Sequence, residues 1–226
     1  NMHVLKQLLT KTEVAEFRQA LQHVPWLDGK GSAMGMAAAV KHNAQADRDH
    51  HQVQQLANRL LAKFGHNPSL MAAALPHRIY PPCFNSYAAG GHYGWHVDAA
   101  IMRLPDQQIL RSDLSITVFL SEPEDYQGGE LVIQTDFGEQ SVKLAAGDAV
   151  LYSSATLHQV MPVTAGQRVA AISWLQSMIP GTALRETLYQ LDLSIQALAG
   201  HSGVERAELD RLHHIYHNLI RQHAQV

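Results

Sequence analysis

The amino-acid sequence predicts an α+β chain with a mainly β core, a sandwich or jelly roll, flanked by helices. From residue 77 to 178, hydrophobic side chains recur with a period of two, and turn-forming residues arrive roughly every 8 to 12 positions. On either side of this stretch the period changes to that of a helix. We therefore expect an N-terminal helical region packing on the core (1–76), the jelly-roll core (77–178) and a C-terminal helical region (179–226).

Two helices are predicted before the core. The first opens at the capping box TKTE, from Thr10 to Glu13, and the second begins near Asp49 and stops near the segment GHNP. Hydrophobic residues at helical spacing mark one face of each: Val14, Phe17, Leu21 and Val24, then Val53, Leu56, Leu60 and Phe64. The connecting segment DGKGSAMGMAAAVKHNAQ fits either a loop over an active site or a plain surface connection.

Six strand-like segments form the predicted core. They are DLSITVFL, GELVIQ, QSVKL, DAVLY, HQVMPV and RVAAISWL. The turn signals between them include EDYQGG, TDFGE, AAGD and TAGQ, the last placed between HQVMPV and RVAAISWL. Many short strands without intervening helices indicate a sandwich or jelly roll.

A helical pattern returns after Pro180. Its hydrophobic positions are Leu184, Leu188, Leu191 and Ile195, followed by Leu209, Leu212, Tyr216, Leu219 and Ile220. A helical appendage on a barrel is a candidate homodimer interface, so we expect a possible homodimer through the C-terminal helices.

Composition excludes several classes of protein. The formal net charge is -3 and no run of five or more like charges occurs, which argues against a nucleic-acid partner. No apolar run approaches the roughly 18 residues of a membrane span, and the N-terminal segment lacks the apolar stretch of a signal peptide. The single cysteine, Cys83, excludes an intrachain disulfide and a cysteine-based zinc cluster. We expect a cytoplasmic protein with no membrane partner.

The pair His96 and Asp98 is the first candidate for chemistry. If both residues lie on a strand, they face the same side, roughly 6.5 Å apart at their Cα atoms, and can reach one metal ion. The pair alone is a common pattern, so a third ligand is needed. His158 is the best candidate because it begins a strand of the same β region. Two imidazoles and one carboxylate form the facial triad that holds non-haem Fe(II) and leaves three positions open.

Arg168 is the second candidate. It shares one face of its strand with Ala170, Ile172 and Trp174, an otherwise apolar set. An arginine directed into apolar surroundings is costly unless it meets an anion, and its planar fork suits a carboxylate. That anion is either a protein Asp or Glu, or the far carboxylate of a bound dicarboxylic acid.

Asn85 and Tyr87 lie two residues apart on the strand that precedes the metal pair. A carboxamide and a phenol pointing into a barrel can donate hydrogen bonds to a ligand carboxylate. For each residue alone, core packing or a turn hydrogen bond is the competing interpretation. Beside His96 and Asp98, we predict that both help to bind the dicarboxylate.

These motifs resemble those of the Fe(II)/2-oxoglutarate dioxygenases of the prolyl-4-hydroxylase type. The resemblance is carried by FNSYAAGGHYGWHVD, by GGEL at 128–131 and by GDAVLYSSATLHQVMPVTAGQR at 147–168. The segments ALPHRIYPPCFNSY and VFLSEPEDYQGGELVIQ and the helical C-terminus are similar to the bacterial PKHD-type hydroxylases associated with iron uptake. The resemblance extends over the whole chain and implies the double-stranded β-helix form of the jelly roll.

The resemblance also implies a reaction. Fe(II) would be held by His96, Asp98 and His158, while Arg168 would pair with the C5 carboxylate of 2-oxoglutarate. With O2, such enzymes hydroxylate a substrate and convert 2-oxoglutarate into succinate, and L-ascorbate is the expected reductant of stray Fe(III). The substrate itself stays open between a prolyl residue, another peptide side chain and a small molecule such as a siderophore.

Three other interpretations compete with this one. A non-catalytic, cupin-like binding or sensing module would use the same metal face. A nucleic-acid demethylase of the same superfamily would carry a second arginine six residues after Arg168, where this sequence has Trp174. A halogenase would replace the carboxylate of Asp98 with a small residue.

Overall fold

Two antiparallel sheets form the centre of the computed structural model, which describes residues 2–33 and 35–226. The eight-stranded sheet has the order β1-β14-β10-β17-β6-β4-β2, with β5 paired to β17. Its strands are β1 (His3–Leu5), β2 (Trp26–Asp28), β4 (Ala44–Ala46), β5 (Pro76–Ile79), β6 (Cys83–Tyr87), β10 (Leu114–Phe119), β14 (Ala149–Ser153) and β17 (Arg168–Ser177).

The five-stranded sheet has the order β13-β12-β15-β7-β3. Its strands are β3 (Lys41–His42), β7 (His92–His96), β12 (Leu131–Thr135), β13 (Gly138–Val142) and β15 (His158–Val160). Two further pairs are β8 (Ile101–Arg103) with β9 (Ile109–Arg111) and β11 (Tyr126–Gly128) with β16 (Val163–Gly166). This mainly antiparallel β core with flanking helices confirms the predicted fold class.

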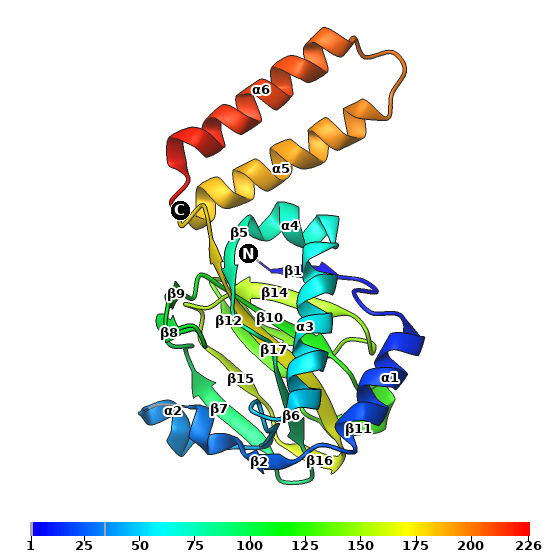
Figure 1. The fold of residues 1–226 in the computed structure, drawn as a ribbon, viewed down its shortest axis with the longest axis vertical. Coiled ribbons are helices and arrows are strands. Elements are labelled where there is room, and N and C mark those ends of the chain that lie inside the picture. Colours follow the sequence, from blue (N-terminus) through cyan, green and yellow to red (C-terminus); the bar gives the residue numbers. More distant parts are fainter. Residues whose placement is uncertain (1, 34) are drawn as a thin grey trace.

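The helices lie outside the two sheets (Figure 1). They are α1 (Lys11–Leu21), α2 (Met36–Ala39), α3 (His51–Gly65), α4 (Pro68–Ala74), α5 (Thr182–Ala199) and α6 (Arg206–His223), with 3-10 turns η1 (Gly29–Ser32) and η2 (Pro123–Asp125). The predicted capping box of α1 is present, because the Thr10 side chain accepts from the Glu13 amide and Glu13 accepts from the Thr10 amide.

Alternation along the strands creates a separate core on each face of the larger sheet. On β10, Ile116 and Val118 belong to the core that also contains Phe17 of α1 and Leu60 of α3. The next residue, Phe119, points the other way, into a second core shared by both sheets. The candidate site lies in this second core, between the sheets.

The first 76 residues contribute strands as well as the predicted helices. β1, β2 and β4 extend the larger sheet, and β3 adds an edge to the smaller one. These strands have only two or three residues each. A period of two cannot be recognised over so short a stretch, so the sequence pattern does not reveal them.

The prediction of a turn at TAGQ is wrong. Residues 163–166 form β16, which pairs with β11 and does not fold back on β15. Pro162 ends the preceding segment because it has no amide to donate to a sheet. Gly166 has a positive φ of 76°, and a Cβ there would come within 2.1 Å of the Asp125 carbonyl oxygen. The chain therefore bends at this glycine before it enters β17.

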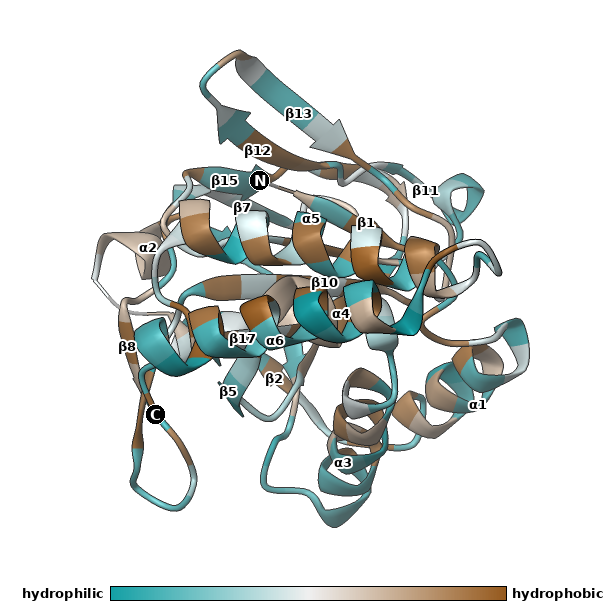
Figure 2. Ribbon diagram, turned by 90° about the horizontal axis from the view of Figure 1, so that it is seen from above, coloured by the Kyte–Doolittle hydropathy of each residue, from teal (hydrophilic) through white to brown (hydrophobic). Residues whose placement is uncertain are grey.

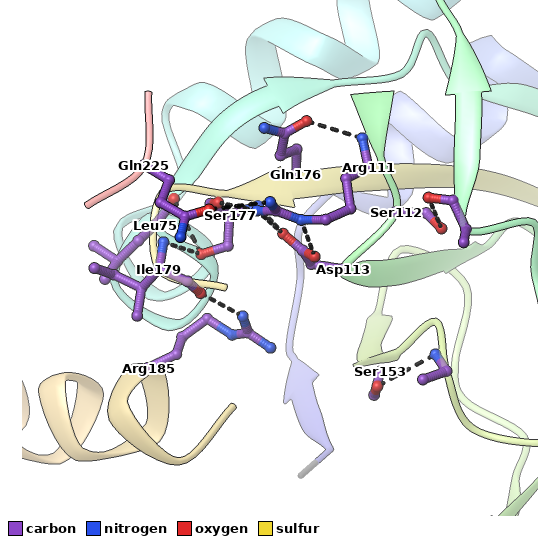
Figure 3. A network of polar contacts seen from close by, with 12 residues as sticks. Leu75, Arg111, Ser112, Asp113, Ser153, Gln176, Ser177, Ile179, Arg185 and Gln225 are labelled. Atoms are coloured by element: carbon purple, nitrogen blue, oxygen red, sulfur yellow. Dashed lines mark hydrogen bonds and ion pairs between the residues drawn. The ribbon is translucent and has the colours of Figure 1, made fainter. Parts of the chain in front are cut away.

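The C-terminal helices are joined to the larger sheet by polar contacts (Figure 3). Asp113 accepts two hydrogen bonds from the Arg111 guanidinium, at 2.7 and 3.0 Å, and one from the amide of Ser177 at 2.8 Å. Arg111 also reaches Gln225, near the end of the chain, at 3.3 Å. This network holds the end of β17 and the last residues together.

The α5 and α6 pair projects from one end of the sheets (Figure 1), and both helices alternate hydrophobic and hydrophilic residues (Figure 2). Leu188, Ile195 and Tyr216 are buried where the two helices meet. Within the described part of the chain, no helix is both long and apolar enough to cross a membrane.

Candidate metal centre and dicarboxylate pocket

The smaller sheet brings the three predicted metal ligands together. His96 ends β7 and His158 begins β15, and the antiparallel register places them directly opposite each other. Asp98 follows β7 and lies outside the strand, so the loop rather than the strand period directs its carboxylate. Asp98 Oδ1 is 3.6 Å from His96 Nε2 and 3.4 Å from His158 Nε2. The ligand atoms of the three residues all lie within 4.8 Å of one another.

Backbone carbonyl groups orient both imidazoles. His96 Nδ1 lies 2.7 Å from the Gly94 oxygen, and His158 Nδ1 lies 2.8 Å from the Thr156 oxygen. With the proton on Nδ1 donated to the carbonyl, the Nε2 lone pair of each ring points to the centre of the cluster. This is the arrangement that metal-binding histidines need, because the outer hydrogen bond selects the tautomer.

Two side chains that the sequence analysis did not select hold the carboxylate of Asp98. Its Oδ2 accepts from Ser115 Oγ at 2.6 Å and from Trp174 Nε1 at 3.0 Å. Ser115 is in turn 2.8 Å from Ser154 Oγ. These bonds occupy Oδ2 and leave Oδ1 to face the histidines. Ser115 and Thr117 are both hydroxyl residues on the inward face of β10, so the sequence pattern does not single out Ser115.

The charges of the cluster favour a cation. Burial alone would raise the pKa of Asp98, but the neighbouring His158 and His96 and the hydrogen bond from Ser115 hold that pKa well below its usual range. Burial would lower the pKa of His158, and the neighbouring Asp98 carboxylate outweighs this and raises it. The site thus keeps an ionised carboxylate in a buried position, where a divalent cation can neutralise it.

Arg168 lies in the second core at the start of β17 and is only 2% exposed. Its guanidinium sits over the rings of Tyr87 and Phe119, 5.2 and 5.4 Å from their centroids. Among the described residues it forms no ion pair, and its Nε has no hydrogen-bond partner. Two anions were considered as partners for Arg168, a protein carboxylate and a ligand carboxylate. No Asp or Glu in the described part of the chain pairs with it. A buried, unpaired guanidinium fits a ligand anion.

Further polar groups without partners accompany Arg168. Tyr87 is its direct neighbour across β6 and β17, and Asn85 lies two residues along on the same face. Asn85 Oδ1 and the hydroxyl of Tyr126 are buried and have no hydrogen-bond partner in the part of the chain that the structure describes. Burial raises the pKa of Tyr126, and the charge of Arg168 opposes that rise, so the two groups are close. Buried polar groups are rarely left unpaired in proteins, and together these suit a carboxylate.

Tyr126 was not selected from the sequence. It stands in EDYQGG, which was interpreted as a turn, whereas it begins the short strand β11. No pattern in the sequence separates its buried hydroxyl from an ordinary surface tyrosine. Only the pairing of β11 with β16 brings its side chain toward Arg168.

Comparison with known proteins identifies the family. A sequence profile of the 2OG-Fe(II) oxygenase superfamily matches residues 82–176, and a profile of the PKHD-type hydroxylase C-terminal domain matches residues 183–225. A PKHD-type hydroxylase of Alteromonas mediterranea is 59% identical over 226 residues, covering 100% of both chains. One of Shewanella frigidimarina is 58% identical over the same length and coverage.

Solved structures share the fold at low sequence identity. A Trichoplax adhaerens prolyl hydroxylase, in complex with a hypoxia inducible factor peptide fragment, has a TM-score of 0.54 at 14% identity and covers 83% of this chain and 86% of that chain. HygX from Streptomyces hygroscopicus, with nickel, 2-oxoglutarate and hygromycin B bound, has a TM-score of 0.51 at 17% identity, covering 79% and 84%. The resemblance inferred from the sequence is confirmed, and the chain belongs to the PKHD-type hydroxylase family within the 2OG-Fe(II) oxygenase superfamily.

Proposed function

We propose that this 2-oxoglutarate-dependent hydroxylase holds Fe(II) with His96, Asp98 and His158 and binds the C5 carboxylate of 2-oxoglutarate with Arg168. One observation carries the proposal. Three ligand atoms within 4.8 Å share the space between the sheets with a buried arginine that has no anion in the described part of the chain. A metal and a dicarboxylate together account for both features.

The bound iron, with O2 and 2-oxoglutarate, supplies the oxidising chemistry that hydroxylates a C–H bond while the cosubstrate loses CO2 and becomes succinate. The protein contributes positioning. The carbonyls of Gly94 and Thr156 and the side chains of Ser115 and Trp174 set the direction of each ligand atom. The open side of the triad then remains for cosubstrate and O2.

The cosubstrate pocket is built for one dicarboxylate. We assign Tyr87, Asn85 and Tyr126 to hydrogen bonds with the carboxylate that pairs with Arg168. The rings of Tyr87 and Phe119 exclude water from the guanidinium, which strengthens its attraction for an anion.

The decisive experiment is an anaerobic titration of Fe(II) and 2-oxoglutarate into metal-free protein, following the weak visible charge-transfer band of the chelate. We expect a band with the natural protein, no band with Asp98→Ala, and a band that needs far more 2-oxoglutarate with Arg168→Ala. Tight metal binding without any band would instead favour the non-catalytic, cupin-like module.

Ascorbate and a reducing compartment follow as secondary proposals. We propose ascorbate as the reductant that returns stray Fe(III) to Fe(II), so its addition should prolong turnover. We also propose the cytoplasm as the compartment, because reducing conditions suit both Fe(II) and the free, buried thiol of Cys83. Fractionation of cells would test the location.

A homodimer through the C-terminal helices remains a proposal. Leu193 and Leu198 on α5 and Ile215 on α6 are exposed apolar side chains on the projecting pair of helices. Covering them with the same helices of a second copy would bury this surface. Sedimentation of the natural protein beside Leu193→Glu tests it, and a monomer in both cases would contradict it.

A further inference from the structure

Two cations near the metal centre have no carboxylate partner. Lys41 of β3 is only 8% exposed, and its ammonium donates one hydrogen bond, to Ser32 Oγ at 2.6 Å. Arg48, which follows β4, donates to the hydroxyl of Tyr80 and approaches Cys83 Sγ at 3.8 Å. Neither cation takes part in an ion pair among the described residues. An ammonium offers three donors, so Lys41 has two to spare.

The ring of Tyr93 connects Lys41 to the metal centre. It is paired with Tyr93 across β3 and β7, and its Nζ is 5.1 Å from the centroid of that ring. The Tyr93 ring also stacks on His96, with centroids 3.6 Å apart. The ammonium therefore lies beside Tyr93 of β7, the strand that also contains the proposed iron ligand His96.

A second series of contacts, through Tyr80 and Trp174, connects Arg48 to the same centre. Its guanidinium lies 5.3 Å from the centroid of the Tyr80 ring, and Tyr80 packs edge-on against Trp174 with centroids 5.5 Å apart. Trp174 is the residue that donates to Asp98. Arg48 itself is exposed, so it can meet a ligand that arrives from solvent.

Cys83 lies within electrostatic reach of both cations and does not neutralise them. Burial raises the pKa of the Cys83 thiol, and the charges of Arg48 and Lys41 only partly oppose that rise. The sulfur is thus a neutral thiol at pH 7. Asp28 and Asp98 act on Lys41 from beyond ion-pair distance.

The cosubstrate does not explain this second positive site. Arg168 pairs with Tyr87 at one end of β6, whereas Cys83 pairs with Ile172 at the other end. Four residues of strand separate these positions by roughly 13 Å. The proposed function uses both carboxylates of 2-oxoglutarate, one at Arg168 and one at the metal, so the cosubstrate leaves Lys41 and Arg48 without an anion.

The surroundings of Cys83 are apolar. Tyr80, Cys83 and Leu110 form a small buried cluster, and Ile172 and Trp174 pack against it. The partly exposed side chains of Ile172 and Trp174 offer a ligand hydrophobic contacts near the two cations, and such a combination suits the orientation of a small molecule.

We propose that Lys41 and Arg48 bind an anionic group of carboxylate type on the primary substrate, whose remaining body is apolar and packs beside Ile172 and Trp174. This inference rests on the proposed function, because it takes the metal centre as the place of reaction. It defines the substrate class as an apolar molecule or side chain with a carboxylate near the carbon that is hydroxylated.

The test uses benzoate and its neutral analogue benzamide as probes. Each is added to the anaerobic protein loaded with Fe(II) and 2-oxoglutarate, and the broadening of its proton signals by the paramagnetic iron is measured by NMR. The natural protein should bind benzoate about tenfold more tightly than benzamide. Lys41→Gln and Arg48→Gln should each remove most of this preference, and Arg48→Lys should keep part of it.

Arg103→Gln is the matched control, because Arg103 is an exposed arginine of the neighbouring β8 strand whose guanidinium donates to the Gln107 carbonyl. It should leave the preference unchanged. Lys41 is buried, so if Lys41→Gln does not fold, the exposed Arg48→Gln decides the question.

Three results would overturn the inference. Equal broadening by benzoate and benzamide in the natural protein removes the anion site. A preference that survives both Lys41→Gln and Arg48→Gln assigns it to other residues. A raised 2-oxoglutarate requirement in these variants, read from the visible band, assigns the cations to the cosubstrate. Absence of the band in the natural protein would refute the proposed function itself, and the inference with it.

Discussion

The proposed metal centre and the proposed dicarboxylate pocket occupy one space between the sheets but differ in how their polar groups are satisfied. His96, Asp98 and His158 each have an outer hydrogen-bond partner within the protein. Arg168 Nε and the Tyr126 hydroxyl have none among the described residues. The fold thus already directs the proposed metal ligands, whereas the polar groups of the proposed pocket would be satisfied by a bound ligand. Substitutions should therefore act differently in the two regions.

The largest effect is expected from Asp98→Ala, which removes the carboxylate from the proposed ligand set of His96, Asp98 and His158. Iron affinity should fall about 10³-fold or more, since the two histidines alone provide neither the charge nor the third position. Iron content after gel filtration measures this. The 2-oxoglutarate pocket is untouched, so full retention of iron would mean that other residues bind it.

Arg168→Lys should affect the pocket and spare the metal. Lysine keeps the charge but loses the planar fork that matches a carboxylate, so we expect the KM for 2-oxoglutarate to rise about 10- to 100-fold with unchanged iron content. Steady-state succinate production gives the KM. An unchanged 2-oxoglutarate dependence would count against the role assigned to Arg168.

Trp174→Phe tests whether the outer hydrogen bonds direct the metal ligands. The change removes the Nε1 donor to Asp98 while keeping an aromatic ring beside Tyr80. We expect iron affinity to fall about tenfold. Trp95→Phe is the matched control, because Trp95 is partly exposed on β7 and makes no hydrogen bond to Asp98. Equal effects of the two substitutions would refute a specific role for Trp174.

The smallest and most diagnostic effect is expected from Tyr126→Phe. It removes a buried hydroxyl that has no partner among the described residues, so the free energy of unfolding should stay constant or rise by up to about 1 kcal/mol. Affinity for 2-oxoglutarate should fall by about three- to tenfold. Thermal unfolding with and without 2-oxoglutarate measures both. A variant that is less stable without ligand would show that the hydroxyl serves the fold.

Much of the site could be predicted because its residues are chemically unusual where they stand. Arg168 is a charge in the apolar pattern of β17, and His96, Asp98 and His158 combine the ligand types that Fe(II) prefers. Ser115, Trp174 and Tyr126 could not be assigned roles in this way. Serine on a strand, or tryptophan and tyrosine in a core, is compatible with ordinary packing, so residue type alone does not reveal the partner.

The sequence by itself determined the β core and its flanking helices, and it supplied the four proposed site residues, since the spacing of hydrophobic residues and the chemical type of a side chain can be read locally. The tertiary structure decided which atoms meet. Strand register set His158 opposite His96, the loop after β7 turned Asp98 toward both, and β3 carried Lys41 to the ring that stacks on His96. Such contacts depend on pairing between distant segments, and a two-residue strand such as β3 has no periodicity from which that pairing could be predicted.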